Sequence, residues 1–221
     1  MRIVLALFLS ILISFSGAAT SGVLALSSSE RFRSGNDILF SNKDASDSIS
    51  GDFVYYSQLN PNWANKPYNY TETDEANWIL IGNAGCGPTS LAMIIATTIN
   101  SSVTPVEVAE LGYDNGSLVI GTGTDHSLLF KAAQKEWGVR YVDMSGDSME
   151  QIMLFVESGG YIYMAGTGPE PFTEDGHVIV IKSADVTANT VTVADPYRED
   201  NTIYSVDEID ASRTLTYGVS G

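Results

Sequence analysis

The stretch Asn83-Ala84-Gly85-Cys86-Gly87-Pro88-Thr89-Ser90 holds the one cysteine of the 221-residue chain, set between two glycines. Apolar residues follow at helical spacing, so we expect a helix over Pro88–Ile99 with one buried face and Cys86 at its start. The positive end of a helix dipole favours a thiolate, which is the reactive form of cysteine. The flanking glycines leave room for a substrate, and the Cys86 N–H, unpaired at a helix start, is free to bind an oxyanion. The stretch therefore predicts that Cys86 is a nucleophile.

Two other roles are open to a cysteine that has no partner for an intramolecular disulfide. It can link two chains, or it can lie buried as a structural thiol. Composition alone favours the structural thiol, because single cysteines are usually buried. The helix start and the glycines favour the nucleophile instead.

A cysteine nucleophile needs a base, and the chain has only two histidines. His177 follows a glycine and opens a strongly apolar strand, which places an imidazole at a strand end where it can face a helix start. His126 lies at a predicted helix start, where the dipole disfavours a cation, so we expect it to cap the helix or line the substrate site. The sequence therefore predicts His177 as the base.

Asp195 ends the strand that follows the strand of His177. Adjacent antiparallel strands would bring the two residues to neighbouring positions at one end of the sheet, where the carboxylate could orient the imidazole. An Asp-Pro pair at a strand end is also a common turn signal, so a purely structural role for Asp195 stays open.

These motifs together resemble a known family. Gln58 before an aromatic loop, then Gly85–Ser90, Gly176-His177-Val178 and Ala194-Asp195-Pro196, is similar to the bacteriocin-processing-peptidase-like branch of papain-like cysteine peptidases. The resemblance covers roughly residues 53–209. It implies the papain-like fold, with Cys86 as nucleophile, His177 as general base, Asp195 as the residue that orients it, and Gln58 as an oxyanion donor. The best-known members are transporter domains that cut double-glycine leaders, a specificity that we do not transfer to this chain.

The predicted function is a secreted cysteine peptidase that hydrolyses peptide bonds through a thioacyl-enzyme, with a peptide or protein as substrate. A transpeptidase or transglutaminase-like acyltransferase on the same fold is one alternative. A non-catalytic module that binds peptide or cell-wall material is another, and exposed aromatic side chains between residues 58 and 84 could form its surface. We expect no cofactor and no metal, because the three His and Cys residues lack the spacing of metal ligands.

The order of predicted elements indicates an α+β domain, with an N-terminal helical half and a C-terminal antiparallel sheet. We expect helices at Pro88–Ile99, Pro105–Leu111, Ser127–Trp137 (capped by Thr124 or Asp125) and Ser148–Ser158. We expect strands at Phe53–Ser57, Val139–Met144, Tyr161–Ala165, His177–Lys182 and Thr190–Ala194. Residues 58–84 read as a long loop, and Ile203–Val219 as a short helical or turn segment followed by a final strand.

The N-terminus has the features of a secretory signal peptide. Arg2 precedes the apolar run Ile3–Phe15, and small residues follow. We assign residues 1–25 to the signal, with cleavage after Ala18 or Ala19, and an uncleaved membrane anchor stays open because the apolar pattern resumes before residue 26. Residues 26–52 are polar and read as a linker or pro-segment, and residues 53–221 as the peptidase domain. These features predict a secreted or extracytoplasmic protein.

The formal net charge is -16, from 11 basic and 27 acidic residues. Nucleic acids and anionic membranes repel such a surface, so neither is expected as a partner. We expect a monomer that does not insert into a membrane after the signal is removed.

Overall fold

The computed structural model describes residues 52–221. The predicted signal peptide, residues 1–25, and all but the last residue of the predicted linker, residues 26–52, lie outside the described residues. Within residues 52–221, none of the helices combines the length and the apolar character that crossing a membrane would require.

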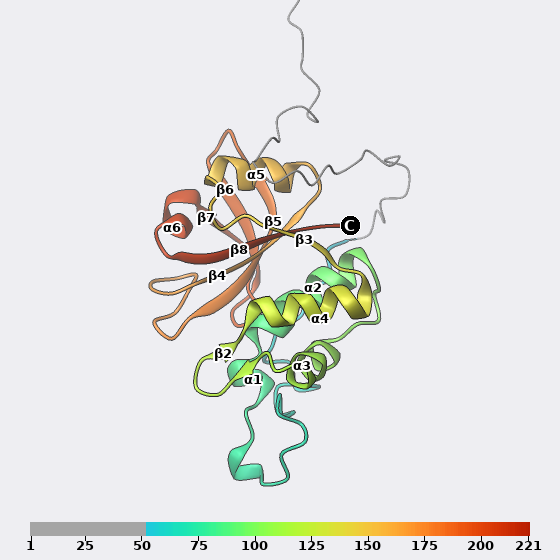
Figure 1. The fold of residues 1–221 in the computed structure, drawn as a ribbon. Helices are drawn as coiled ribbons and strands as arrows, with labels where there is room; N and C mark the ends of the chain where they lie inside the picture. The colour runs from blue at the N-terminus through green and yellow to red at the C-terminus, as the bar shows by residue number, and fades with distance from the viewer. Residues whose placement is uncertain (1–51) are drawn as a thin grey trace, which may run out of the picture. The chain divides into compact units, whose positions relative to one another are not determined.

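Six antiparallel strands form one sheet in the order β3-β8-β4-β5-β6-β7 (Figure 1). Their bounds are β3 Arg140–Asp143, β4 Tyr161–Gly166, β5 His177–Asp185, β6 Thr190–Ala194, β7 Asp200–Ser205 and β8 Arg213–Ser220. The chain passes from β4 through β5 and β6 to β7 as a meander, and β8 returns to lie between β3 and β4. Strand β5, which begins with the predicted base His177, and strand β6, which Asp195 follows directly, are therefore neighbours in the sheet.

The helices mostly precede the sheet. Their bounds are η2 Glu75–Asn77 (a 3-10 turn), α1 Ile81–Ala84, α2 Cys86–Thr98, α3 Pro105–Asp114, α4 His126–Trp137, α5 Met149–Glu157 and α6 Val206–Asp210. Side-chain caps begin most of them: capping boxes form at α3 (Thr104 and Glu107), α5 (Ser148 and Gln151) and α6 (Ser205 and Glu208), Asp125 caps α4, and Asp74 caps η2. Each cap satisfies backbone N–H groups that the first helical turn leaves unpaired.

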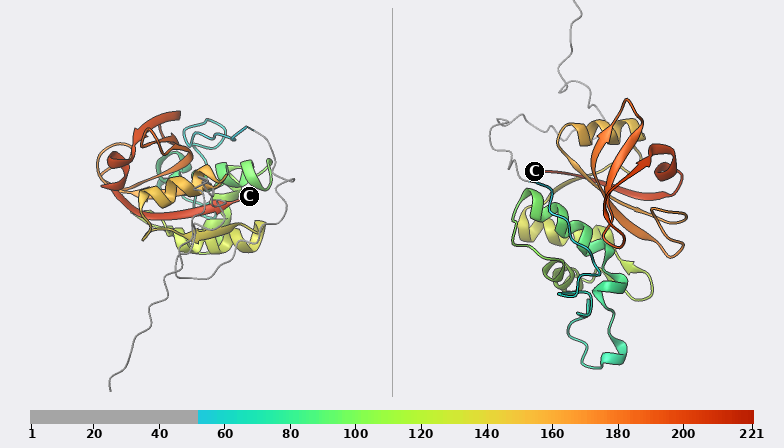
Figure 2. Two further views of the ribbon diagram at one scale, coloured as in Figure 1. Left: turned by 90° about the horizontal axis from the view of Figure 1, so that it is seen from above. Right: turned by 180° about the vertical axis from the view of Figure 1, so that it is seen from behind.

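Alternate residues of the sheet pack into different cores. On β4, Tyr163 and Ala165 belong to the core shared with α2, α3 and α4, whereas Ile162 and Met164 belong to the core shared with α5 and α6. Figures 1 and 2 show α2 and α5 on opposite sides of the sheet. Each fully buried Ile or Leu stabilises the fold by about 1.5–3 kcal/mol relative to an exposed one. The predicted α+β class, with the helical half preceding most of the antiparallel sheet, is confirmed.

Helix α2 differs from the expectation of one buried face. Every residue from Gly87 to Thr97 is buried. The sheet, α3 and α4 surround the helix, so its polar positions, such as Ser90, are enclosed together with the apolar ones. The helix that begins with Cys86 is therefore the central element of its half of the molecule.

The predicted strand Phe53–Ser57 is wrong, since this segment pairs with no strand of residues 52–221. Its side chains contact both halves of the molecule instead. The Tyr55 hydroxyl donates to the carbonyl of Asp195 in the sheet half (2.8 Å), and the Tyr56 hydroxyl donates to the carbonyl of Val103 in the helical half (3.1 Å). The segment is therefore an extended connection between the two halves.

One short hairpin and one edge strand were not predicted. A two-stranded hairpin, β1 (Leu118–Val119) and β2 (Gly123–Thr124), lies between α3 and α4. Strand β7 begins with Asp200 and Asn201, polar residues that gave no strand pattern. These polar residues fit in the strand because β7 is the edge of the sheet, where one side of the strand faces solvent.

Candidate active site

Cys86 is the first residue of α2, as predicted, and its side chain is half-buried. Gly85 joins α1 to α2 in a tight turn. A Cβ atom at Gly85 would lie 2.6 Å from Cγ2 of Ile81, closer than real Cβ contacts, so glycine is required there. In this position the Cys86 N–H has no acceptor within its own helix. The thiol is therefore within reach of solvent at a helix N-terminus.

His177 is the first residue of β5 and is 6% exposed. Gly176 precedes it with a φ of 93°, a left-handed conformation that favours glycine. Its Nε2 atom lies 2.7 Å from Oδ1 of Asp195, and the Cys86 side chain is close enough to raise the pKa of the imidazole. Because Nε2 is engaged by the carboxylate, Nδ1 is the nitrogen left for the thiol.

The pKa of His177 reflects these contacts. Burial disfavours the imidazolium and lowers the pKa, but the hydrogen bonds to Asp195 and Cys86 and the negative charges of both partners raise it more strongly. The result is a pKa of about 9, against an ordinary value of 6.5. The site therefore favours a protonated imidazole at neutral pH.

Asp195 lies just beyond the end of β6 and is 1% exposed. Burial would raise its pKa, but the hydrogen bond and charge of His177, followed by hydrogen bonds from Arg198 and the Tyr197 N–H, hold the pKa below its usual value. The Tyr197 N–H donates to Oδ1 (2.8 Å), and the Asp195 N–H donates to the Glu199 carbonyl (3.0 Å). Asp195 thus both contacts His177 and organises the turn that follows β6, so the two roles left open by the sequence are combined.

Gln58 is 2% exposed and joins the two halves beside the site. Its backbone N–H donates to the carbonyl of Pro196 (2.7 Å), and its Nε2 donates to the carbonyl of Gly82 in α1 (2.9 Å). One N–H of the amide nitrogen remains beyond the bond to Gly82.

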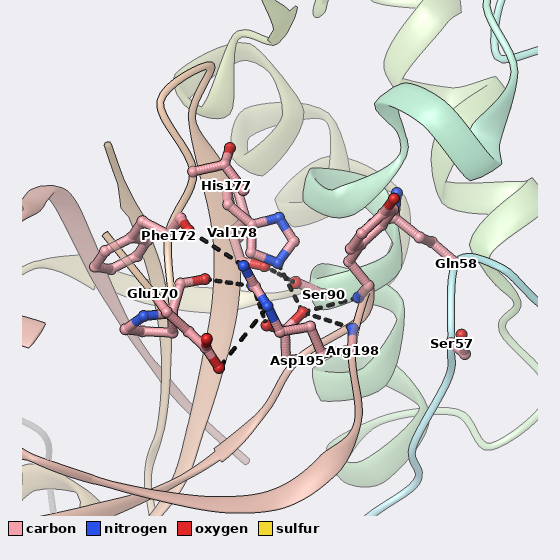
Figure 3. Close-up of polar contacts among 12 residues, drawn as sticks. Ser57, Gln58, Ser90, Glu170, Phe172, His177, Val178, Asp195 and Arg198 are labelled. Atoms are coloured by element: carbon pink, nitrogen blue, oxygen red, sulfur yellow. Dashed lines mark hydrogen bonds and ion pairs between the residues drawn. The ribbon is translucent and has the colours of Figure 1, made fainter. Parts of the chain in front are cut away.

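Helix α2 and strand β5 are tied together near the ends that carry Cys86 and His177. The Ser90 hydroxyl donates to the carbonyl of Val178 (3.3 Å), one residue after His177. Figure 3 shows this contact together with the row formed by His177, Asp195 and Arg198. The relative position of the thiol and the imidazole is thereby fixed by buried contacts.

His126 does not join this arrangement. It begins α4, as predicted, but Asp125 is the cap, and Nδ1 of His126 lies 2.7 Å from the hydroxyl of Tyr163. Burial lowers the pKa of His126 to about 4, only partly opposed by the charge of Asp125. It is therefore a neutral side chain near neutral pH, held by a buried tyrosine.

Two residues beside Asp195 and His177, Arg198 and Tyr197, were not predicted from the sequence. Arg198 donates from Nη1 to Oδ2 of Asp195 (2.8 Å), and the ring of Tyr197 meets that of His177 edge-on, with centroids 6.3 Å apart. The signal for Arg198 was its position three residues after Asp195 in an otherwise acidic stretch. Among residues 52–221, no group of three or more His, Cys, Asp or Glu side chains is placed to hold a metal ion.

Comparisons with known proteins agree with the motif resemblance. The model of the Peptidase_C39 like family matches residues 51–217. A crystal structure of a candidate C39-like peptidase from Bacillus anthracis superposes with a TM-score of 0.55 at 18% identity, covering 79% of this chain and 97% of that one. This likeness is one of fold, and it supports the papain-like cysteine peptidase fold expected from the motifs.

A second solved structure is the peptidase domain of Streptococcus ComA, a bifunctional ABC transporter involved in a quorum sensing pathway. It is 18% identical with a TM-score of 0.44, and the match covers 61% of this chain and 89% of that one. No curated protein matches the chain. The family model spans most of the sequence, including all four predicted site residues, and the chain therefore belongs to the Peptidase_C39 like family.

Proposed function

We propose that the protein is a cysteine peptidase in which Cys86 is the nucleophile, His177 the general base and acid, and Asp195 the residue that orients the imidazole. Family membership supports a peptidase activity. The observation that carries the cysteine mechanism is that the imidazole lies 2.7 Å from the Asp195 carboxylate and has the thiol at the start of α2 near enough to raise its pKa. A thiol activated by a base that a third group orients is the arrangement of a covalent nucleophile.

In the proposed acylation step, the Cys86 sulfur forms a bond to the carbonyl carbon of the scissile amide. The proton held between Cys86 and His177 passes to the leaving nitrogen as the C–N bond breaks. An amine leaves, and a thioester remains on Cys86. The raised pKa of His177 supports this step because the imidazolium is available to protonate the amine.

The oxyanion that forms in this step needs donors. The Cys86 N–H at the helix start and the remaining N–H of the Gln58 amide are proposed for this role, each worth about 3–4 kcal/mol in comparable sites. The bond between Gln58 and Gly82 holds that amide beside the turn that precedes Cys86.

In the proposed deacylation step, water attacks the thioester while His177 accepts its proton. The C–S bond breaks, a carboxylic acid is released, and the thiol of Cys86 is restored with the proton from His177. An amine acceptor in place of water would give the acyltransferase alternative, so the same acyl-enzyme serves both.

The test compares the full chain with Cys86→Ala on a library of internally quenched peptides, with and without added primary amines. We expect cleavage that depends on Cys86 and releases free carboxylic acids. Products joined to the added amine would indicate an acyltransferase instead. Binding of peptides without any Cys86-dependent product would overturn the enzyme proposal in favour of a binding module.

We further propose that the protein acts outside the cytoplasm, on the basis of the signal-peptide features at residues 1–25. N-terminal sequencing of the exported protein tests this. A new terminus near residue 19 or 20 is expected, whereas an intact Met1 on membrane-bound protein would indicate the anchor.

A further inference from the structure

Arg198 and His177 hold different oxygens of the Asp195 carboxylate (Figure 3). Nη1 of Arg198 donates to Oδ2 of Asp195 (2.8 Å), whereas Nε2 of His177 lies 2.7 Å from Oδ1. The remaining donors to this carboxylate, the N–H groups of Tyr197 and Arg198, reach only Oδ1. Arg198 is therefore the sole hydrogen-bond donor to Oδ2 within residues 52–221.

This division of donors matters for orientation. A carboxylate can rotate about the bond to its Cβ atom, and any rotation would carry Oδ1 away from the imidazole. A charged donor on Oδ2 opposes that rotation with one of the stronger hydrogen bonds available in proteins. Burial strengthens the interaction, because Asp195 is 1% exposed and the Arg198 side chain is 29% exposed.

The same guanidinium also hydrogen-bonds backbone carbonyls of the loop between β4 and β5. Nη1 donates to the carbonyl of Pro171 (2.7 Å) and Nη2 to that of Phe172 (3.3 Å). Nε lies 3.9 Å from a carboxylate oxygen of Glu170, which itself accepts a hydrogen bond from Tyr204 (3.0 Å). Nη1 thus holds Asp195 and the Pro171 carbonyl together, while Nη2 anchors the planar donor fork to the Phe172 carbonyl.

We infer that Arg198 is a positioning residue of the proposed peptidase: it fixes the Asp195 carboxylate in the rotamer that holds His177 toward Cys86. The inference rests on the proposed function, since it assigns a role within that site. It concerns a residue that does not touch the substrate and acts only through Asp195 and His177.

The other titratable groups around this pair do not compete in the neutral range. The Tyr55 hydroxyl approaches from residues 53–57, where burial and then the Asp195 charge raise its pKa to about 12. Tyr204 approaches from β7, where burial and the hydrogen bond to Glu170 raise its pKa to about 12. His177 and Cys86 lie on the substrate side, and the Glu170 carboxylate faces Arg198 from the loop between β4 and β5.

The experiment measures the rate at which iodoacetamide alkylates Cys86 between pH 4 and 9, because this readout needs no knowledge of the substrate. The variants of the full chain are R198Q, which removes the charge and the fork, and R198K, which keeps only the charge. Arg213→Gln is a matched control. Arg213 also pairs with an aspartate three residues before it (Asp210, 2.5 Å) and donates to two loop carbonyls, but it lies outside the site.

We expect R198Q to lower the labelling rate near pH 6 by about 10- to 100-fold, the loss that outer partners of a catalytic group commonly cause. In the plot of labelling rate against pH, we also expect the fall on the acid side to occur at a higher pH in R198Q, because the guanidinium no longer holds down the pKa of Asp195. R198K should return this fall to the wild-type pH and give an intermediate rate. Arg213→Gln should match the wild type in both respects.

An R198Q profile identical to the wild type, or an equal shift in Arg213→Gln, overturns the positioning role alone. Wild-type Cys86 that is labelled only after denaturation overturns the proposed function and this inference with it. If circular dichroism shows that R198Q is unfolded, R198K decides: a reduced labelling rate supports the inference, and an unchanged rate overturns it.

Discussion

Nε2 of His177 lies 2.7 Å from Oδ1 of Asp195, and both side chains are almost entirely buried. The contact joins two strands that are direct neighbours in the sheet, and burial removes water that would otherwise compete for it. This contact sets the orientation of the imidazole ring: one nitrogen faces the carboxylate, and the other is available to the thiol.

Asp195→Asn tests whether the carboxylate orients and stabilises the His177 imidazolium. An amide can still organise the turn after β6, but it cannot stabilise an imidazolium. We expect peptide cleavage to fall by about 10²- to 10⁴-fold, the usual contribution of general acid–base catalysis. Initial rates on a cleaved peptide measure the effect. Asp207→Asn, at an exposed position of α6, is the control, and an equal loss there would contradict the prediction.

Gln58→Ala separates the oxyanion role from thiol activation. Loss of one oxyanion donor should lower kcat by about 10²- to 10³-fold. Alkylation by iodoacetamide forms no oxyanion, so its rate should change little. Asn69→Ala removes another buried amide that is bonded to backbone, and it should cost stability without lowering kcat. Equal losses of cleavage and alkylation in Gln58→Ala would count against the oxyanion role.

The pH profile of the wild-type enzyme should fall on the alkaline side as His177 loses its proton. Its pKa is raised to about 9, so the imidazolium that protonates the leaving amine disappears as pH rises through that value. We therefore expect kcat/KM to hold from neutral pH to about 8 and then to fall near pH 9. A decline centred near 6.5 would show that His177 titrates as an unperturbed imidazole.

His126 should make the fold sensitive to acid. Its pKa falls from 6.5 to about 4 on folding, so the unfolded chain binds a proton that the folded protein excludes, and stability decreases as pH falls from 6.5 toward 4. The loss is at most about 3 kcal/mol, since one pKa unit corresponds to about 1.4 kcal/mol. Urea unfolding at pH 7 and pH 4.5 measures it. The loss between these pH values should be smaller in His126→Gln, and an equal loss would contradict the prediction.

Gly85→Ala should displace the start of α2. The new Cβ would lie 2.6 Å from Cγ2 of Ile81 and closer still to the Ile81 backbone carbonyl, so the turn between α1 and α2 must shift. Overpacking of this kind costs about 1–3 kcal/mol, and we expect slower alkylation of Cys86 as well. Gly146→Ala, where nothing lies within 4 Å, should leave both stability and labelling unchanged.

Local patterns predicted much of this structure because they act over a few residues. The start of α2 at Cys86, the Asp125 cap and the pairing of β5 with β6 follow from helical spacing, capping and adjacency. Burial of α2 on all sides could not be read in this way, because it depends on which elements surround the helix. Arg198 was missed for a related reason: its partners at Asp195 and in the β4–β5 loop meet only in the folded sheet.

The segment that was mistaken for a strand has a consequence for how the molecule could lose activity. Its Val54 N–H donates to Thr97 in α2 (3.0 Å), and the N–H of Gln58 donates to Pro196 beside Asp195 (2.7 Å). The five residues from Val54 to Gln58 therefore connect the half that carries the thiol to the half that carries the imidazole. Mild denaturation that broke these two hydrogen bonds would separate Cys86 from His177 while the helices and the sheet remained intact. The protein would then lose activity before it unfolds.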